Sequence, residues 1–211
     1  MKWKFGDNPF DPKIRLPGLV SLPQSKFKEI IDKRNQLRLS LASPSAPDTV
    51  YVRLITTNDA SSHFIRWFTW SRYSHVEFVT PSGYLGALLN GGVLIRPFDY
   101  CKPATELVLK CTTTPSISAK IINFATYQLF KPYNTQGIFD FATHDSAIEQ
   151  RSWFCSQLVA AAFYNGGYPL FRGDKFYKLT PRDIELSIRL SELEKSDIDL
   201  IAGWKSKAGG K

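Results

Sequence analysis

Two short segments that lie far apart in the chain contain the residue types needed for nucleophilic chemistry. The first, SRYSHVEFV at 71–79, has the alternation of a β-strand, in which every second side chain points to the same face. His75 and Glu77 would share one face with Tyr73, so that an imidazole and a carboxylate lie side by side. A solvated outer face would give the same pattern, because many strands are polar on the side that meets water.

The second segment, SWFCSQLVAAAFYNGG at 152–167, has the pattern of a helix of about three turns. Ser152 is a suitable N-cap, and the closing NGG is typical of a helix end. Cys155 would then lie in the first turn, where unpaired backbone amides and the helix dipole favour the thiolate over the thiol. The segment therefore predicts a cysteine nucleophile at a helix N-terminus.

A nucleophilic cysteine works with an imidazole within hydrogen-bond reach and with a third polar group that orients the ring. The sequence thus indicates a catalytic site made of Cys155, His75 and Glu77. The alternative is that Cys155 is a small apolar residue in a packed helix, as free cysteines often are. Residues i and i+2 of a strand are roughly 6–7 Å apart, which is long for a direct contact between His75 and Glu77. Other candidates for the third polar group are Asn134, Asp140 and His144.

The elements that would position these residues follow the order of an α+β fold, with an antiparallel sheet packed against helices. Runs of β-branched and alternating residues predict the strands, and helical spacing of apolar residues predicts the helices. The segment at 136–142 is compatible with either a helical turn or a short strand. The expected strands are 49–57, 71–79, 84–89, 93–100 and 105–113, and the expected helices are 25–41, 61–70, 117–130 and 152–167.

The chain divides into three parts. Residues 1–48 form a basic, proline-rich N-terminal arm that includes a short amphipathic helix at 25–41. Residues 49–203 form the globular domain, and residues 204–211 read as a basic flexible tail. The part at 1–24 has too many apolar side chains for a solvated segment, so we expect it to dock, on a protein partner or a second copy of the chain rather than wholly on its own domain.

Composition narrows the class of protein. The chain has 211 residues and a net charge of +8, but its basic residues are scattered and no nucleic-acid-binding module is recognisable, so nucleic acid is not favoured as a partner. No apolar run approaches the ~20 residues of a membrane span. The N-terminus has no apolar signal-peptide core, which predicts a cytoplasmic or virion-associated protein. Cys101, Cys111 and Cys155 lack metal-like spacing, and no metal or other cofactor is expected.

The stretches YSHVEFV, YLGA, GGVLIRPFDY, WFCSQLVAAAF and LTPRDIE together resemble the circularly permuted branch of the NlpC-type papain-like superfamily, the YiiX-like and lecithin-retinol-acyltransferase-like proteins. In that branch the strand that carries the catalytic histidine precedes the helix that carries the cysteine, which is the order found here. The resemblance covers about 50–190 and implies a permuted papain-like fold. It implies that Cys155 and His75 are catalytic, in a cysteine hydrolase that cleaves an amide bond, foremost in peptidoglycan stem peptides, with a lipid ester or amide as the other option.

One departure from the pattern of this family concerns the third polar residue. Many members carry it on the strand after the histidine, about a dozen residues on, whereas residues 83–87 here read GYLGA and offer no polar partner for an imidazole. Glu77 is the nearest substitute. Because of this departure, the docking arm and the missing export signal, a non-enzymatic structural or adaptor protein, for example in a phage particle, remains the alternative function.

Overall fold

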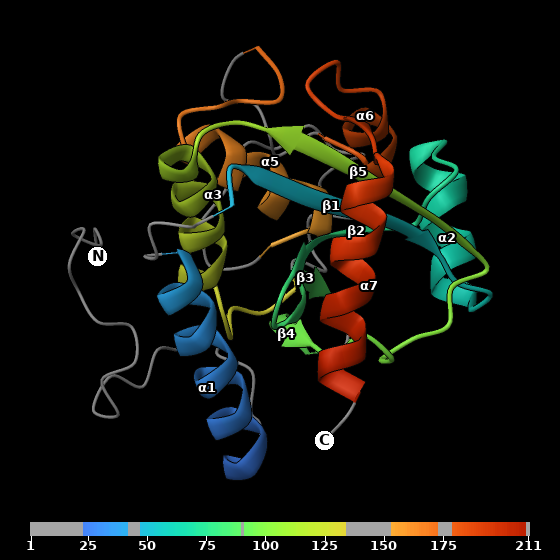
Figure 1. The fold of residues 1–211 in the computed structure, drawn as a ribbon. Coiled ribbons are helices and arrows are strands. Elements are labelled where there is room, and N and C mark those ends of the chain that lie inside the picture. The colour runs from blue at the N-terminus through green and yellow to red at the C-terminus, as the bar shows by residue number, and fades with distance from the viewer. Residues whose placement is uncertain (1–22, 42–46, 90, 134–152, 173–178, 210–211) are drawn as a thin grey trace, which may run out of the picture.

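Six strands form one antiparallel sheet in the order β4-β3-β2-β1-β5-β6 in the computed structural model (Figure 1). The structure describes residues 23–41, 47–89, 91–133, 153–172 and 179–209. The fold is α+β, as the sequence predicts. The strands are β1 (Thr49–Thr56), β2 (His75–Thr80), β3 (Gly83–Leu88), β4 (Gly92–Arg96), β5 (Thr105–Thr112) and β6 (Ser191–Glu192).

Helices cover both faces of this sheet (Figure 1). The four helices expected from the sequence are present with boundaries that differ by a few residues, whereas α6 and α7 were not predicted. None of the helices in the described ranges is both long and apolar enough to cross a bilayer. The helices are α1 (Gln24–Leu41), α2 (Ala60–Thr69), α3 (Pro115–Tyr127), α5 (Cys155–Asn165), α6 (Pro181–Glu185) and α7 (Lys195–Gly209).

One face of the sheet is apolar and carries the main core. Helix α5 packs on β2 and β3, and α3 packs beside α5. The ring of Phe78 on β2 lies 6.1 Å, between centroids, from that of Phe163 on α5. The run Ala160, Ala161 and Ala162 is buried, so small side chains let α5 approach the strands closely. This packing fixes the position of the whole helix, including its first residue.

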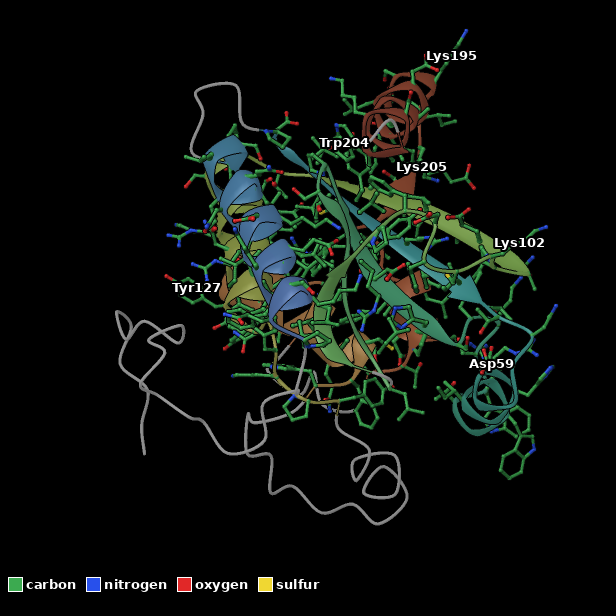
Figure 2. The ribbon with its side chains drawn as sticks, turned by 90° about the horizontal axis from the view of Figure 1, so that it is seen from below. Asp59, Lys102, Tyr127, Lys195, Trp204 and Lys205 are labelled. Carbon is green, nitrogen blue, oxygen red and sulfur yellow. The ribbon has the colours of Figure 1, made fainter. Side chains whose placement is uncertain are left out.

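The opposite face carries a smaller cluster that α7 covers. Figure 2 shows Trp204 on the side of α7 toward the strands, while Lys195 points away from the molecule. The Trp204 ring meets Tyr51 of β1 edge-on at 5.7 Å between centroids, and Ile201 is buried in the same cluster. The Tyr51 hydroxyl donates to Asp197 at 2.7 Å.

This packing corrects the expectation of a flexible tail over 204–211, because α7 continues to Gly209. The basic residues after position 204 suggested a solvated tail. However, Ile201 and Trp204 are three positions apart and fall on one side of the helix, where they pack together. The expected docking segment at 1–24 lies almost entirely outside the described residues.

We expect Trp204→Ala to lower the free energy of unfolding by about 1–3 kcal/mol, less than the ~3–5 kcal/mol typical of a fully buried aromatic side chain. The measurement is chemical denaturation followed by circular dichroism. Lys205→Ala is the matched control, because Lys205 is exposed on the same turn and should change stability by no more than about 0.5 kcal/mol. Equal stabilities for the two variants would mean that this end of α7 is a tail.

Candidate active site

The first residue of β2 is His75, and hydrogen bonds fix the point at which this strand begins. Ser74 donates to the carbonyl oxygen of Ile55 on β1 from its amide at 2.9 Å and from its hydroxyl at 3.3 Å. Ser62 of α2 in turn donates to the Ser74 hydroxyl at 2.7 Å. The strand thus starts four residues later than expected, and Tyr73 lies in the main core rather than beside His75 and Glu77 on one strand face.

The first residue of α5 is Cys155, in agreement with its predicted place in the first turn. The N-cap residue is Phe154, while Ser152, which we expected as the cap, lies outside the described residues. The Phe154 amide donates to the Gln157 side-chain oxygen at 3.1 Å, so this amide already has a partner. Cys155 is buried, and its thiol sits where the helix dipole favours a negative charge.

The thiol of Cys155 and the imidazole of His75 lie close enough for each group to shift the pKa of the other. Burial alone would lower the pKa of His75, but its contacts with Cys155 and Glu77 outweigh burial and raise that pKa to about 9. Burial alone would raise the pKa of Cys155, but His75 and the backbone amides of Val76 and Ser156 lower it. The arrangement therefore favours a thiolate beside an imidazolium.

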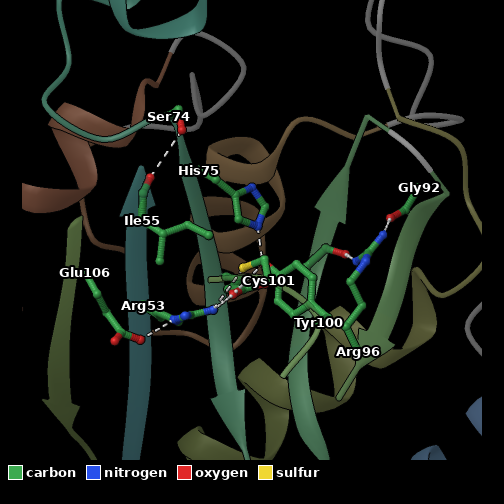
Figure 3. Close-up of polar contacts among 11 residues, drawn as sticks. Arg53, Ile55, Ser74, His75, Gly92, Arg96, Tyr100, Cys101 and Glu106 are labelled. Atoms are coloured by element: carbon green, nitrogen blue, oxygen red, sulfur yellow. Dashed lines mark hydrogen bonds and ion pairs between the residues drawn. The ribbon is translucent and has the colours of Figure 1, made fainter. Parts of the chain in front are cut away.

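The carboxylate of Glu77 is fully buried and contacts the same imidazole directly. Its Oε2 lies 3.3 Å from His75 Nε2 (Figure 3). The backbone spacing of the two residues suggested a gap too long for this contact, but the two side chains converge and close it. Burial would raise the pKa of Glu77, and the nearby cationic groups of His75 and Arg53 lower it instead.

Two further residues hold this carboxylate, and the sequence analysis assigned neither of them to the site. Arg53 Nη1 on β1 donates to Glu77 Oε1 at 2.8 Å. The Tyr100 hydroxyl, from the segment between β4 and β5, lies 3.1 Å from both Glu77 oxygens. Figure 3 shows the side chains of Arg53 and Tyr100 extending toward each other from opposite sides. A charged residue inside the otherwise apolar strand TVYVRLIT is the sequence signal that could have identified Arg53.

A glycine on the neighbouring strand makes room for the Glu77 side chain. A Cβ atom added to Gly86 of β3 would lie 2.7 Å from Glu77 Cβ and 3.6 Å from its Oε2. Arg96 Nη1 donates to the Gly86 carbonyl oxygen at 3.0 Å, and Arg96 Nη2 donates to that of Gly92 at 2.9 Å. At this position β3 has no side chain beyond its backbone, and Glu77 occupies the space.

Tyr133 is another site residue that the sequence analysis missed. Burial, together with its interaction with Cys155, raises the pKa of the Tyr133 hydroxyl well above its ordinary value. Tyr133 pairs with Trp153 in a parallel β-bridge, and its ring meets Phe154 edge-on at 5.5 Å between centroids. These contacts join the end of α3 to the start of α5 and bring a phenol to the thiol.

The other predicted candidates do not enlarge this group. Asn134, Asp140 and His144 lie outside the described residues. Cys101 and Cys111 carry free thiols, and burial raises the pKa of Cys111 to about 11. Among the residues that the structure describes, no three histidine, cysteine or acidic side chains gather where they could hold a metal ion.

A scan against protein-family models finds none that matches this chain, and a search of curated proteins finds no match either.

We expect Cys155 to react with iodoacetamide at pH 6.5 roughly tenfold or more faster than Cys111, as measured by peptide mass spectrometry. The pKa of Cys155 is lowered and that of Cys111 is raised to about 11, while both thiols are buried to a similar extent. The rate for Cys155 should fall only when the pH drops below its lowered pKa. His75→Ala should abolish the difference, and equal rates in the native protein would identify Cys155 as an ordinary buried thiol.

We expect Gly86→Ala to destabilise the fold by about 1–3 kcal/mol, because the new methyl group would overlap the rigid stem of Glu77. Gly203→Ala is the matched control: it adds the same methyl group in α7 with no atom within 4 Å, and it should stabilise by about 0.5–1 kcal/mol. Thermal and chemical denaturation measure both effects. A neutral Gly86→Ala would contradict the close approach of Glu77.

Proposed function

We propose that this protein is a cysteine hydrolase of the permuted papain-like type, with Cys155 as nucleophile, His75 as general base and acid, and Glu77 as the group that orients the imidazole. The observation that carries the proposal is the row of interacting groups Cys155, His75 and Glu77, in which the imidazole lowers the pKa of the thiol and its Nε2 lies 3.3 Å from Glu77 Oε2. The nucleophile, the base and the orienting group of a cysteine hydrolase occur in this order.

In the proposed reaction the Cys155 thiolate attacks the carbonyl carbon of an amide, and a tetrahedral intermediate forms. As the C–N bond breaks, the imidazolium of His75 gives its proton to the departing amine and an acyl-thioester remains on Cys155. His75, now neutral, accepts a proton from water, and the resulting hydroxide attacks the thioester. Release of the carboxylic acid restores the thiolate and imidazolium.

Two donors are suited to stabilise the oxyanion of the tetrahedral intermediate. The Cys155 amide is at the first position of α5, where helix amides have no intrahelical acceptor. The Tyr133 hydroxyl lies at the sulfur and can donate to an oxygen on the carbon that the sulfur attacks. The neighbouring Phe154 amide is a poor donor here because it is bonded to Gln157.

The arrangement of the chain supports the permuted papain-like fold. The strand with the imidazole precedes the helix with the thiol in the sequence, and that helix packs against an antiparallel sheet within an α+β architecture. The resemblance makes an amide of a peptidoglycan stem peptide the proposed substrate, with a lipid ester or amide as the other chemistry. The contact between Glu77 and His75 supplies a third polar group, whose lack was one reason to consider a non-enzymatic adaptor.

We expect p-nitrophenyl acetate to acylate Cys155, giving a burst of p-nitrophenolate that matches the enzyme concentration. Mass spectrometry of the quenched protein should locate the acetyl group on Cys155. Cys155→Ala should abolish the burst, and His75→Ala should slow it. A wild-type protein that stays unacylated under conditions in which it is folded would overturn the hydrolase proposal and favour the adaptor.

The substrate class is tested separately with purified muropeptides and, in parallel, with phospholipid vesicles. Liquid chromatography with mass spectrometry should show a new amine and a new carboxylic acid from a stem peptide, and no product with Cys155→Ala. Release of fatty acid from the vesicles, without cleavage of stem peptides, would keep the hydrolase and replace the substrate.

A further inference from the structure

Arg53 is a buried cation in the centre of the sheet, and its pairing is specific. Its Nη1 donates to Glu77 and its Nε donates to Glu106 of β5. The guanidinium carbon lies 4.0 Å above the centre of the Tyr84 ring. Removing a guanidinium from water is costly unless it is paired, and apolar residues would fill the centre of a sheet at lower cost. The position of Arg53 is therefore better explained by what it does to its partners than by sheet stability.

The two oxygens of Glu77 have separate partners. Oε1 accepts from Arg53 at 2.8 Å, whereas Oε2 faces His75 at 3.3 Å. The Tyr100 hydroxyl, 3.1 Å from each oxygen, fixes the rotation of the carboxylate about its last bond. If Arg53 were absent, Glu77 would lose its ion pair with a permanently charged group, and the neutral Tyr100 hydroxyl would be left to hold Oε1.

We propose that Arg53 is a positioning residue of the site: it keeps the buried Glu77 carboxylate ionised and turned toward His75, so that the imidazole retains its proton beside Cys155. The inference rests on the proposed function, and it extends the row of three residues by a fourth that never approaches the reacting atoms. Tyr100 assists Arg53 by fixing the carboxylate plane.

The charges around the Arg53–Glu77 pair determine in which direction the pKa values should move when Arg53 is removed. Loss of the Arg53 cation disfavours the Glu77 anion, so the pKa of Glu77 should rise. A carboxylate that is less ionised stabilises the imidazolium of His75 less, so the pKa of Cys155 should rise in turn and the thiolate should become the minor form at neutral pH. The other titratable and charged groups that face this pair are Glu106 on β5, Tyr84 on β3, Arg96 on β4, Tyr100 and Cys101 between β4 and β5, and His75 on β2.

The experiment follows the rate of Cys155 alkylation by iodoacetamide against pH in the full chain. Arg53→Met should move the acid limb of this profile to higher pH by about one unit or more. Arg53→Lys keeps the charge and should restore most of the wild-type profile. Glu106→Gln is the matched control, since it removes the other partner of Arg53 and should not move the limb upward. In a Glu77→Gln background, Arg53→Met should have a smaller effect.

The outcomes separate this inference from the proposed function. If wild-type Cys155 reacts no faster than Cys111, the proposed function fails and the inference falls with it. If wild-type Cys155 is reactive and the acid limb stays in place in a folded Arg53→Met variant, the inference alone is overturned.

A measurement on the wild-type chain covers the case in which the Arg53 variants do not fold. The side-chain carboxyl carbon of Glu77, assigned in a ¹³C spectrum by comparison with Glu77→Gln, should keep its ionised shift down to pH values below the ordinary glutamate pKa of about 4.3. Protonation of Glu77 above that pH would overturn the inference.

Discussion

The arrangement of the candidate site depends on one constraint, which is that the carboxylate of Glu77 is buried away from water. A buried negative charge is tolerated only when donors surround it, because its hydration is lost. Arg53 comes from one neighbouring strand, Tyr100 from the segment after β4, and His75 from the same strand. Gly86, on the other neighbouring strand, contributes space. Four segments of the chain must therefore be in register before the charge is satisfied, which ties the site to the integrity of the sheet.

The meeting of thiol and imidazole depends on where two elements begin. Helix α5 packs on the apolar face of the sheet, with Phe163 against Phe78, whereas Glu77 and Arg53 belong to the opposite face. A residue in the middle of α5 could not reach a side chain on that face. Cys155 is the first residue of its helix and His75 the first residue of its strand, so the two can meet at the end of the sheet. The Val76 amide, next to His75 on β2, helps to lower the pKa of Cys155, so helix and strand meet at this point.

Local patterns in the sequence predict most of the fold and part of the site. Alternation and helical spacing identify β1 to β5 and the helices α1, α2, α3 and α5, because each buries one continuous apolar side. The two-residue strand β6 is too short to have a pattern, and the docking of α7 depends on contacts with Tyr51, far away in the sequence.

The site residues also divide into those that local patterns predict and those that depend on contacts between distant parts of the sequence. Cys155, His75 and Glu77 follow from helix-end chemistry and strand alternation, which are local properties of the sequence. Tyr100 and Tyr133 reach the site only through tertiary contacts, and no local pattern indicates them. Arg53 is intermediate: a charge within an apolar strand indicates a buried partner, although it does not say which one.

The choice of Glu77 as the third polar residue has a structural consequence of its own. A partner on the next strand is aligned with the histidine only while the two strands keep their register, whereas residues i and i+2 of one strand are joined by covalent backbone. The pair His75–Glu77 thus cannot slip. The Glu77 side chain must, however, turn back along its own strand to reach the imidazole. It can do so only where the neighbouring strand leaves room for it and a cation holds Oε1, the oxygen that does not face the imidazole. Gly86 and Arg53 meet these two requirements. A histidine and a glutamate at this spacing therefore indicate a site of this kind most strongly when a glycine lies opposite the carboxylate on one side and an arginine on the other.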